Sequence, residues 1–424
     1  MEILIIGCGA AGAAAAIASA EAGHRVTVID RNRKPLKKLG VTGNGRGNLM
    51  NNGPWRYYGD ATFAHAVLVA MPPKAVADFL EECGITLVEE DEGRVYPAAN
   101  LASVAVDGLV RRMERLGVEM LPCALAERIL PEKNGFSVLV SITEYAPDQV
   151  KANGKVKKGE AVAQRQLRLK ADRVIVAAGG AAAPAHGTDG SSYGLLTALG
   201  HPLRKTKPAL CALLTDAKPL KGLSGKRVRG ALTLRDAAGA VLHQSQGEAL
   251  FADDGVSGIA AMQLARFVQP GCMLTMDLRL SVMGSNDEDA EAWLRQRRQR
   301  LTVQEKGSLI PVAELFTGCA HPALQAAIER MAGLSPKDTA TDAALAKLAA
   351  AIEKFTLPVT GTRDFDQAQV TAGGLDTAQF DPATMESRLV PGLYAVGEML
   401  DVDGDCGGYN LMFAFAGGLL AGRA

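Results

Sequence analysis

The sequence predicts an α/β protein whose parallel sheet is assembled from both ends of the chain. Residues 1–30 show the pattern of a strand, a glycine turn, an alanine-rich helix and a second strand, which together make a βαβ unit. Residues 173–180 form an apolar strand that runs into two glycines, a pattern typical of a buried parallel strand ending at a ligand crevice. Residues 393–396 repeat the apolar strand pattern ahead of a second apolar helix near the C-terminus.

The middle of the chain differs in pattern and predicts an insertion into this α/β domain. Short alternating strands separated by polar turns fill residues 205–282 and indicate a β-barrel-like domain. Residues 283–357 are rich in Ala, Gln, Arg, Leu and Glu and indicate a small helical domain. Residues 1–204 and 358–424 then form the two parts of one discontinuous domain.

The first glycine turn matches the G-x-G-x-x-G pattern between a strand and a helix. In this setting Gly7 permits the tight turn, Gly9 lets a diphosphate approach bare backbone, and Gly12 allows close helix packing. The N–H groups that begin the helix stabilise the anion. The bland alternative is a glycine turn of an ordinary α/β protein. The residues expected at the diphosphate are Gly7, Gly9, Ala10, Ala11 and Gly12.

An acidic residue ends the second strand of this unit and strengthens the dinucleotide interpretation. Asp30 lies 18 positions after Gly12, where a carboxylate accepts hydrogen bonds from ribose hydroxyls. A carboxylate there disfavours a 2′-phosphate, although Arg31 follows at once and joins the expected cofactor contacts. The motif by itself does not distinguish NAD from FAD.

Two further glycine segments are expected to contact the cofactor. Residues 42–48 have no helical or strand period and are expected to form a loop whose bare backbone and polar side chains contact a ligand, the alternative being a solvated loop. Arg46 offers a planar fork for a phosphate or a carboxylate, the alternative being an exposed charge. The contacts expected from this loop and from the end of the strand at 173–176 are Gly43, Asn44, Gly45, Arg46, Asn48, Ala178 and Gly179.

The segment 397–411 joins the last strand to an apolar helix. Asp401, Asp403 and Asp405 have the spacing of a calcium loop, but Cys406 stands where that loop needs glycine and Met412 where it needs glutamate, which excludes calcium. A helix that begins near Asn410 directs free N–H groups at a partial negative charge, as the pyrimidine ring of a reduced flavin requires. The contacts expected here are Gly397, Glu398, Asp405, Gly408, Tyr409, Asn410 and Leu411.

With these segments in order, the chain resembles the BaiN/YhiN-type flavoproteins, also called the aminoacetone oxidase family, within the glutathione-reductase-like FAD superfamily. The resemblance extends nearly from end to end and includes the blocks 255–258 and 371–374. It implies a Rossmann-like FAD-binding domain interrupted by a β-barrel-like domain and a small helical one. Members of the family usually carry a Cys where this chain has Gly47 and a Thr where it has Cys406. Because of these two differences, the substrate of another family member is not assigned to this chain.

The numbers of charged residues and of cysteines limit the kinds of binding partner and the cellular location that we expect. Lys plus Arg and Asp plus Glu both number 46, which argues against a broad nucleic-acid footprint and leaves only a local patch open. The seven cysteines form no C-x-x-C pair, and the first residues lack the features of a signal peptide, so we expect a cytoplasmic protein. The longest apolar run, residues 411–421, is too short to cross a bilayer and is expected to be a buried helix.

These observations predict an FAD-dependent oxidoreductase that acts on a small organic substrate, in either the reductive or the oxidative direction. Only one dinucleotide motif occurs, so NAD(P)H is expected to dock transiently as electron donor. The alternatives are a flavin-containing RNA-modification or assembly factor and a non-catalytic flavin-binding regulator. Tyr409 and His186 are the candidate catalytic acids or bases, against the alternatives of a packing aromatic and a surface histidine. No histidine has metal-ligand spacing, and no metal is expected.

Overall fold

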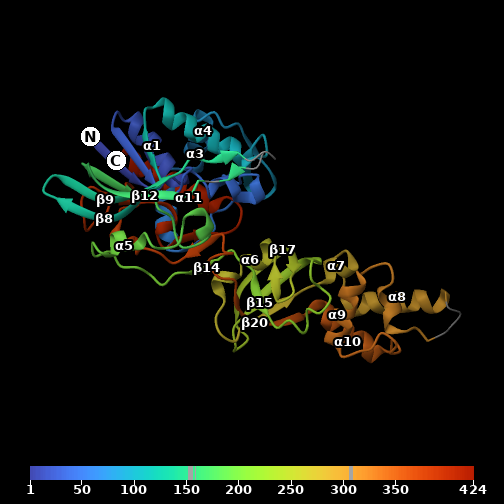
Figure 1. Ribbon diagram of the computed structural model, residues 1–424. Coiled ribbons are helices and arrows are strands. Elements are labelled where there is room, and N and C mark those ends of the chain that lie inside the picture. The colour runs from blue at the N-terminus through green and yellow to red at the C-terminus, as the bar shows by residue number, and fades with distance from the viewer. Residues whose placement is uncertain (151–155, 158, 305–308) are drawn as a thin grey trace. The chain divides into compact units, whose positions relative to one another are not determined.

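The computed structural model describes residues 1–150, 156–157, 159–304 and 309–424. The chain divides into two compact units (Figure 1). Unit 1 comprises Met1–Lys207 and Val370–Ala424, and unit 2 comprises Pro208–Gln369. The chain therefore leaves the first unit once and returns to it near its end.

Unit 1 is built on a five-stranded parallel sheet in the order β22-β13-β1-β2-β7. Ile3, Leu4, Ile5 and Ile6 of β1 are all buried, as the central strand of a sheet covered on both faces requires. Strands from the two ends of the chain belong to this one sheet, which confirms the predicted discontinuous α/β fold. The strands are β1 (Glu2–Ile6), β2 (Arg25–Asp30), β7 (Glu119–Pro122), β13 (Arg173–Val176) and β22 (Leu393–Ala395).

Helices α1 (Ala10–Glu21) and α11 (Tyr409–Arg423) pack against each other with almost no side chain between them. A Cβ on Gly418 would lie 2.2 Å from the carbonyl oxygen of Ala11, and one on Gly422 would lie 2.5 Å from that of Ala15. Only glycine admits so close a backbone approach. The alanine-rich face of α1 and these two glycines of α11 are therefore complementary surfaces.

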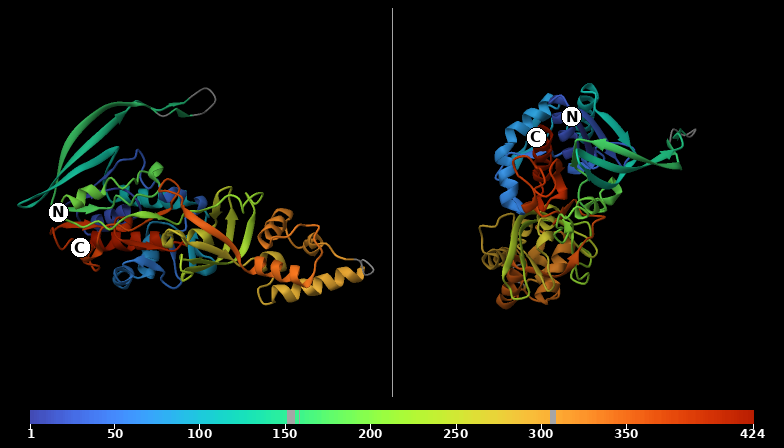
Figure 2. Two further views of the ribbon diagram at one scale, coloured as in Figure 1. Left: turned by 90° about the horizontal axis from the view of Figure 1, so that it is seen from below. Right: turned by 90° about the vertical axis from the view of Figure 1, so that its left-hand side faces the viewer.

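A second, antiparallel sheet lies beside the parallel one, and its long hairpin of β9 and β12 extends outward in Figure 2. The strands of this second sheet are β8 (Ala124–Glu132), β9 (Gly135–Tyr145) and β12 (Ala161–Ala171). The remaining α-helices of unit 1 are α2 (Ala61–Ala70), α3 (Pro73–Glu82), α4 (Ala102–Arg115) and α5 (Tyr193–Thr197).

Short elements complete unit 1 and the boundary with unit 2. Residues 42–48 were expected to be a loop, but η1 (Leu39–Gly45) is a 3-10 segment interrupted by non-helical torsions at Thr42, Gly43 and Asn44. The other short elements are β3 (Met50–Asn51), β4 (Tyr57–Gly59), β5 (Leu87–Glu89), η2 (Asp91–Gly93), β6 (Arg94–Pro97), β10 (Gln149–Val150), β11 (Val156–Lys157), η3 (Pro184–His186), β14 (Lys207–Ala209), β21 (Val370–Ala372), η6 (Thr377–Gln379), η7 (Gly397–Met399) and β23 (Val402–Gly404).

Unit 2 contains a closed barrel of six strands in the order β15-β18-β17-β16-β19-β20. Its interior is apolar because alternate residues of each strand point inward: Val228, Leu232 and Leu234 of β16 are buried, whereas Arg227 and Arg229 are exposed. The strands are β15 (Leu213–Thr215), β16 (Arg227–Arg235), β17 (Val241–Phe251), β18 (Gly255–Ser257), β19 (Met273–Met276) and β20 (Phe355–Thr362).

The helical part of the chain belongs to the same compact unit as the barrel. Strand β20 closes the barrel after the last helix, so the chain returns to unit 1 at Val370, later than the expected residue 358. Among the described residues no single helix is long and apolar enough to cross a bilayer; α2 and α3 pass that test only jointly, bent by 57°. The helices are α6 (Ile259–Met262), η4 (Ala265–Phe267), α7 (Arg279–Met283), α8 (Ala290–Gln304), η5 (Val312–Phe316), α9 (Pro322–Ala332) and α10 (Asp342–Glu353).

The close contact of α1 and α11 gives a first prediction. Replacing Gly418 by Ala should lower the free energy of unfolding by about 1–3 kcal/mol, because the added methyl group would meet the rigid backbone of α1. Gly194→Ala is the matched control, since it changes a helical glycine whose Cβ position is open space. Urea denaturation of the two variants measures the difference. An unchanged stability in Gly418→Ala would contradict the proposed role of this glycine.

Candidate functional site

The glycine turn between β1 and α1 has the geometry that a diphosphate needs. Gly7 has φ +99°, and a Cβ on Gly12 would lie 1.9 Å from the carbonyl oxygen of Gly7, so both glycines are required by the turn itself. Gly9 differs, because nothing lies within 4 Å of its Cβ position and its φ of −87° suits any residue. No side chain caps α1 at Gly9, which leaves the first N–H groups of the helix for a ligand. Ala10 and Ala11 begin that helix.

Asp30 lies at the end of β2 and fixes the backbone around the turn. Its carboxylate accepts hydrogen bonds from the N–H groups of Cys8 at 2.7 Å and Asn32 at 2.7 Å. A carboxylate has about four lone-pair positions, so two remain for ribose hydroxyls. The next residue, Arg31, binds Asp189 at 2.8 Å and Ser191 at 3.3 Å. Its guanidinium group is thus held by the protein at the rim of the site.

The segment 43–48 turns back on itself and passes beside the site. Gly43, Asn44 and Gly45 all have positive φ, and the Asn44 side chain is exposed. Arg46 binds Glu90 at 2.5 Å and Asn100 at 2.5 Å. Its guanidinium also stacks over the Tyr96 ring at 4.1 Å. Arg46 is therefore held by protein partners in this segment's surroundings: a carboxylate, an amide oxygen and an aromatic ring.

The same segment meets the N-terminus of α11. A Cβ on Gly408 would lie 2.7 Å from Oδ1 of Asn48, and that oxygen is buried without a hydrogen-bond partner. An unsatisfied buried acceptor costs about 1–3 kcal/mol, so its retention indicates a ligand that donates to it. No side chain caps α11 at Gly408, and the free N–H groups of the helix begin at Tyr409. Gly47 has φ +78°, and its Cβ position lies 2.9 Å from Cα of Ala102, which explains why no larger residue stands there.

The end of β13 lies next to the glycine turn before α1, and the segment that begins at Gly397 contacts the start of α1. A Cβ on Gly7 would lie 2.9 Å from Cα of Ala178, and one on Gly397 would lie 3.1 Å from Cβ of Ala11. Gly179 follows with φ +77°. The four segments that the sequence nominated separately therefore converge on one site in unit 1.

A partly buried polar network lies against Gly180 and holds the loop after β13. The Glu398 carboxylate binds Lys38 at 2.6 Å and accepts hydrogen bonds from Thr371 N–H at 3.0 Å and its hydroxyl at 2.8 Å. The Thr371 oxygen in turn accepts the N–H groups of Ala181 at 2.8 Å and Ala182 at 3.0 Å. Glu398 thus positions the loop through these residues.

The remaining residues of 405–411 have mainly structural partners. Asp405 is buried, accepts the hydroxyl of Tyr58 at 2.9 Å and lies 3.7 Å from Arg56. The Asn410 side chain accepts from the N–H of Gly404 at 2.8 Å and donates to its carbonyl at 3.0 Å. These bonds fix how α11 begins. Leu411 is half-buried in its first turn.

The two candidate proton-transfer residues lie at different ends of the site. Burial raises the pKa of Tyr409, so its hydroxyl keeps its proton at neutral pH beside the start of α11. Burial, and then the charges of Lys37 and Lys38, lower the pKa of His186, which is therefore neutral at pH 7. The His186 carbonyl accepts from the side chain of Asn32 at 3.2 Å, which places this histidine near the Asp30 end. Its Nδ1 is buried without a partner.

Three residues of the site lie outside the set that the sequence nominated. Lys38 and Thr371 complete the network around Glu398. Tyr193 is 5% exposed, and its hydroxyl has no hydrogen-bond partner in the described structure. Burial, with the charges of Glu398 and Asp401, raises the pKa of Tyr193. Thr371 stands in the glycine block 371–374, which is the one sequence signal that points to any of the three.

These observations fit FAD. The open space at Gly9, the uncapped start of α1 and the carboxylate of Asp30 suit an adenosine diphosphate. The uncapped start of α11 and the unpartnered oxygen of Asn48 suit the pyrimidine ring of a flavin, which has both acceptors and a donor. Within the described ranges, no group of three or more His, Cys, Asp and Glu residues is placed to hold a metal ion.

Fold and site together define a Rossmann-type flavoprotein, an FAD-dependent oxidoreductase. A family model described as "HI0933-like protein Rossmann domain" matches residues 1–424, and the chain belongs to this family. This confirms the expected family, the fold and the FAD cofactor.

Curated relatives match over nearly the whole chain. The 3-dehydro-bile acid delta(4,6)-reductase of Clostridium scindens is 32% identical over 437 residues, covering 100% of this chain and 98% of that protein. The ribosomal RNA dihydrouridine synthase of Escherichia coli is 27% identical over 427 residues, covering 98% and 95%. Among solved structures, a 3-ketosteroid-delta4-(5alpha)-dehydrogenase from Rhodococcus jostii has a TM-score of 0.44 and 18% identity, covering 100% of this chain and 96% of that one.

The contrast between Gly9 and Gly12 gives a second prediction. Gly9→Ala should leave the apoprotein folded, because the methyl group enters open space, yet it should weaken FAD binding at least about tenfold by occupying the diphosphate position. Gly12→Ala should instead destabilise the apoprotein. Gly361→Ala is the control, since it also adds a methyl group to open space but in unit 2. Flavin fluorescence titration and thermal melting separate the two effects; wild-type FAD affinity in Gly9→Ala would contradict this placement of the diphosphate.

Proposed function

We propose that this protein is an FAD-dependent reductase that saturates a carbon–carbon double bond conjugated to a carbonyl group in a small organic substrate. One observation carries the proposal: relatives that match from end to end are named for the same kind of reaction. A Δ4 double bond is conjugated to the ketone of a 3-dehydro bile acid. The bond that is saturated to form dihydrouridine is likewise conjugated to a ring carbonyl.

The residues of unit 1 suit such a reduction. Bound FAD supplies the hydride, and the protein binds and orients the reactants and provides the proton. The N-terminus of α11 favours negative charge near Tyr409, as a reduced flavin ring requires. The Tyr409 hydroxyl, protonated at neutral pH, is the proposed proton donor to the substrate. NAD(P)H is the proposed electron donor, and the seven free cysteines suit the reducing cytoplasm where we place the protein.

A uracil ring within RNA is the second candidate substrate. It is favoured by two full-length relatives named ribosomal RNA dihydrouridine synthase, from Escherichia coli and Haemophilus influenzae, at 27% and 28% identity. The bile-acid relative has the higher identity, 32%, and therefore a small enone remains the first candidate. Both candidates contain a carbon–carbon double bond that is conjugated to a carbonyl group.

Anaerobic half-reactions test the proposed function. NADH or NADPH should bleach the flavin, and a steroid 4-en-3-one should then restore its absorbance at least about tenfold faster than the analogue with an isolated double bond, because only conjugation to the carbonyl stabilises the developing charge. A uridine-containing RNA added in parallel distinguishes the second candidate. Bleaching by an amine with no reoxidation by any enone would make the protein an oxidase. A flavin inert to every reagent would make it a regulator.

The role of Tyr409 gives a further prediction. Tyr409→Phe should keep FAD bound, since the ring still packs, but should slow reoxidation by the substrate about 100-fold or more, because the proton donor is lost. Tyr145→Phe, which removes a hydroxyl from an exposed residue, is the control. Stopped-flow absorbance measures both half-reactions. If Tyr409→Phe reoxidises at the wild-type rate, this residue is a packing aromatic and the proton comes from another group.

A further inference from the structure

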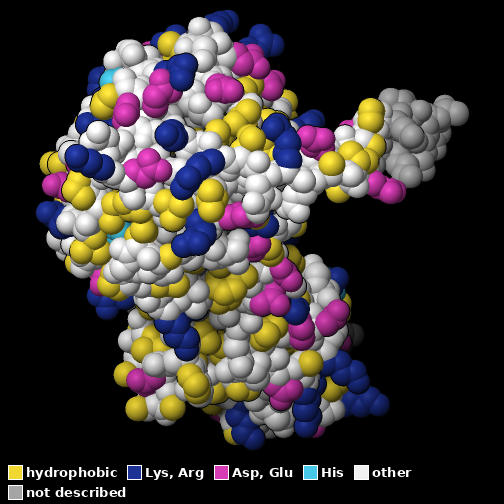
Figure 3. Space-filling view, turned by 60° about the vertical axis from the view of Figure 1, so that its left-hand side comes forward, with side chains coloured by type: hydrophobic (Ala, Val, Ile, Leu, Met, Phe, Trp, Pro, Cys, Tyr) yellow, Lys and Arg dark blue, Asp and Glu magenta, His cyan; other side chains and the backbone are white. Residues whose placement is uncertain are grey.

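Unit 2 carries a concentration of positive charge that the neutral total of the chain conceals. Residues 217–235 contain no Asp or Glu, although each sign of charge numbers 46 in the whole chain. On the face shown in Figure 3, cationic and anionic side chains are largely interspersed, so a local excess of one sign is a departure from the general pattern. The six cations of this segment are Lys218, Lys221, Lys226, Arg227, Arg229 and Arg235.

Most of these cations have no acidic partner. Among the described residues no carboxylate forms an ion pair with Lys218, Lys221, Lys226 or Arg229. Other arginines of unit 2 are neutralised locally: Arg279 binds Asp277 at 2.7 Å, and Arg298 binds Asp342 at 2.7 Å. The charge of the acid-free segment is therefore available to an anionic partner.

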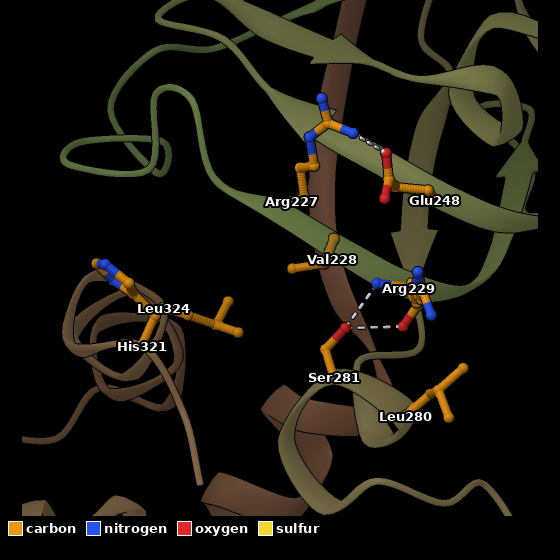
Figure 4. Close-up of a pocket in the computed structure, with 8 residues that line it drawn as sticks. All are labelled: Arg227, Val228, Arg229, Glu248, Leu280, Ser281, His321 and Leu324. Carbon is orange, nitrogen blue, oxygen red and sulfur yellow. Dashed lines mark hydrogen bonds and ion pairs between the residues drawn. The ribbon is translucent and has the colours of Figure 1, made fainter. Parts of the chain in front are cut away.

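A cleft of about 250 Å³ borders this segment, as Figure 4 shows. Arg227 and Arg229 of β16 lie on one side, and His321 at the start of α9 lies on the other. The Nδ1 atom of His321 accepts from the N–H of Ala323 at 3.1 Å. The other lining residues are Val228, Glu248, Leu280, Ser281 and Leu324.

The backbone that presents the two arginines is held firmly. Ser281 of α7 accepts the N–H of Arg229 at 2.6 Å and donates its hydroxyl to the carbonyl of Arg229 at 2.9 Å. The Nη1 atom of Arg227 forms an ion pair with Oε1 of Glu248 at 2.6 Å. The other N–H groups of this guanidinium can bind oxygen atoms of a ligand. The two arginines are thus pre-organised on a strand, whereas Lys218, Lys221 and Lys226 lie in the segment that leads into it.

We propose that this surface, consisting of Lys218, Lys221, Lys226, Arg227 and Arg229, binds the phosphodiester backbone of RNA. Arg227 and Arg229 on β16, together with the three lysines that precede them in the chain, suit successive phosphates, and Val228, Leu280 and Leu324 of the cleft suit the face of a base. An anionic membrane is a poorer partner, because none of the exposed large hydrophobic residues lies in 217–235 to anchor in lipid. The proposal concerns binding alone and does not depend on the proposed reduction. If it holds, it favours the RNA candidate as substrate.

The experiment measures binding of the FAD-loaded, full-length protein to a fluorescein-labelled single-stranded RNA of about 15 nucleotides. Salt is varied from about 50 to 200 mM, since phosphate contacts weaken steeply over this range. The triple variant K226Q/R227Q/R229Q should lose at least about tenfold in affinity, and the slope of log affinity against log salt should fall by about 2, or ~0.7 for each lost contact. Flavin absorbance and thermal melting confirm that the variant is folded.

The variant K337Q/K347Q/K354Q is the matched control. It removes the same charge from exposed lysines of unit 2 outside the acid-free segment and should bind RNA like the wild type. Equal weakening of both variants would show a diffuse charge effect and overturn the proposal, as would an unchanged affinity of the first variant. Phosphatidylglycerol vesicles form a third arm: if the first variant loses vesicle binding but keeps RNA binding, the surface belongs to a membrane and the proposal fails.

Discussion

The contact between α1 and α11 is the constraint on which the cofactor site depends. The two helices come from opposite ends of the chain, and both begin at the site without a side-chain cap. Their N-termini can serve one dinucleotide only if the helices are held at backbone distance, which Gly418 and Gly422 allow against the carbonyls of Ala11 and Ala15. Packing and function are linked here, because the same approach that buries the helices directs two positive helix ends at the ligand.

Glycine serves two separate purposes in this site. At Gly7 and Gly12 the backbone itself leaves no room for a side chain, so these residues are requirements of folding. At Gly9 the space is open and the torsion is ordinary, so the missing side chain makes room for something that is not protein. This difference is invisible in the G-x-G-x-x-G pattern and becomes clear only when the surroundings of each Cβ are known.

The fold was largely predictable from the sequence, and the detail of the site was not. Strand and helix periods are local properties, so the βαβ unit, the discontinuous sheet and the barrel all follow from the residues. Side-chain partners come from distant segments, and for that reason the sequence nominated Arg46 for a ligand without revealing Glu90 and Asn100. The return to unit 1 was placed too early because β20 has the same apolar pattern whether it closes a barrel or resumes a sheet. Lys38 was missed because its partner, Glu398, is 360 positions away.

The local distribution of charge likewise could not be judged from the total charge of the chain. A neutral total argues against a polyanion only if the two signs are mixed everywhere, whereas binding depends on the field within a Debye length of about 8–10 Å. In unit 2 several acids lie beside arginines that they neutralise, such as Asp277 with Arg279, and the segment 217–235 has no acid of its own. Neutrality of the chain therefore coexists with a segment in which most cations have no acidic partner among the described residues. Whether this flavoprotein acts on a small enone alone or also on a base in RNA therefore depends on the local electrostatic field of this segment and not on the total charge of the chain.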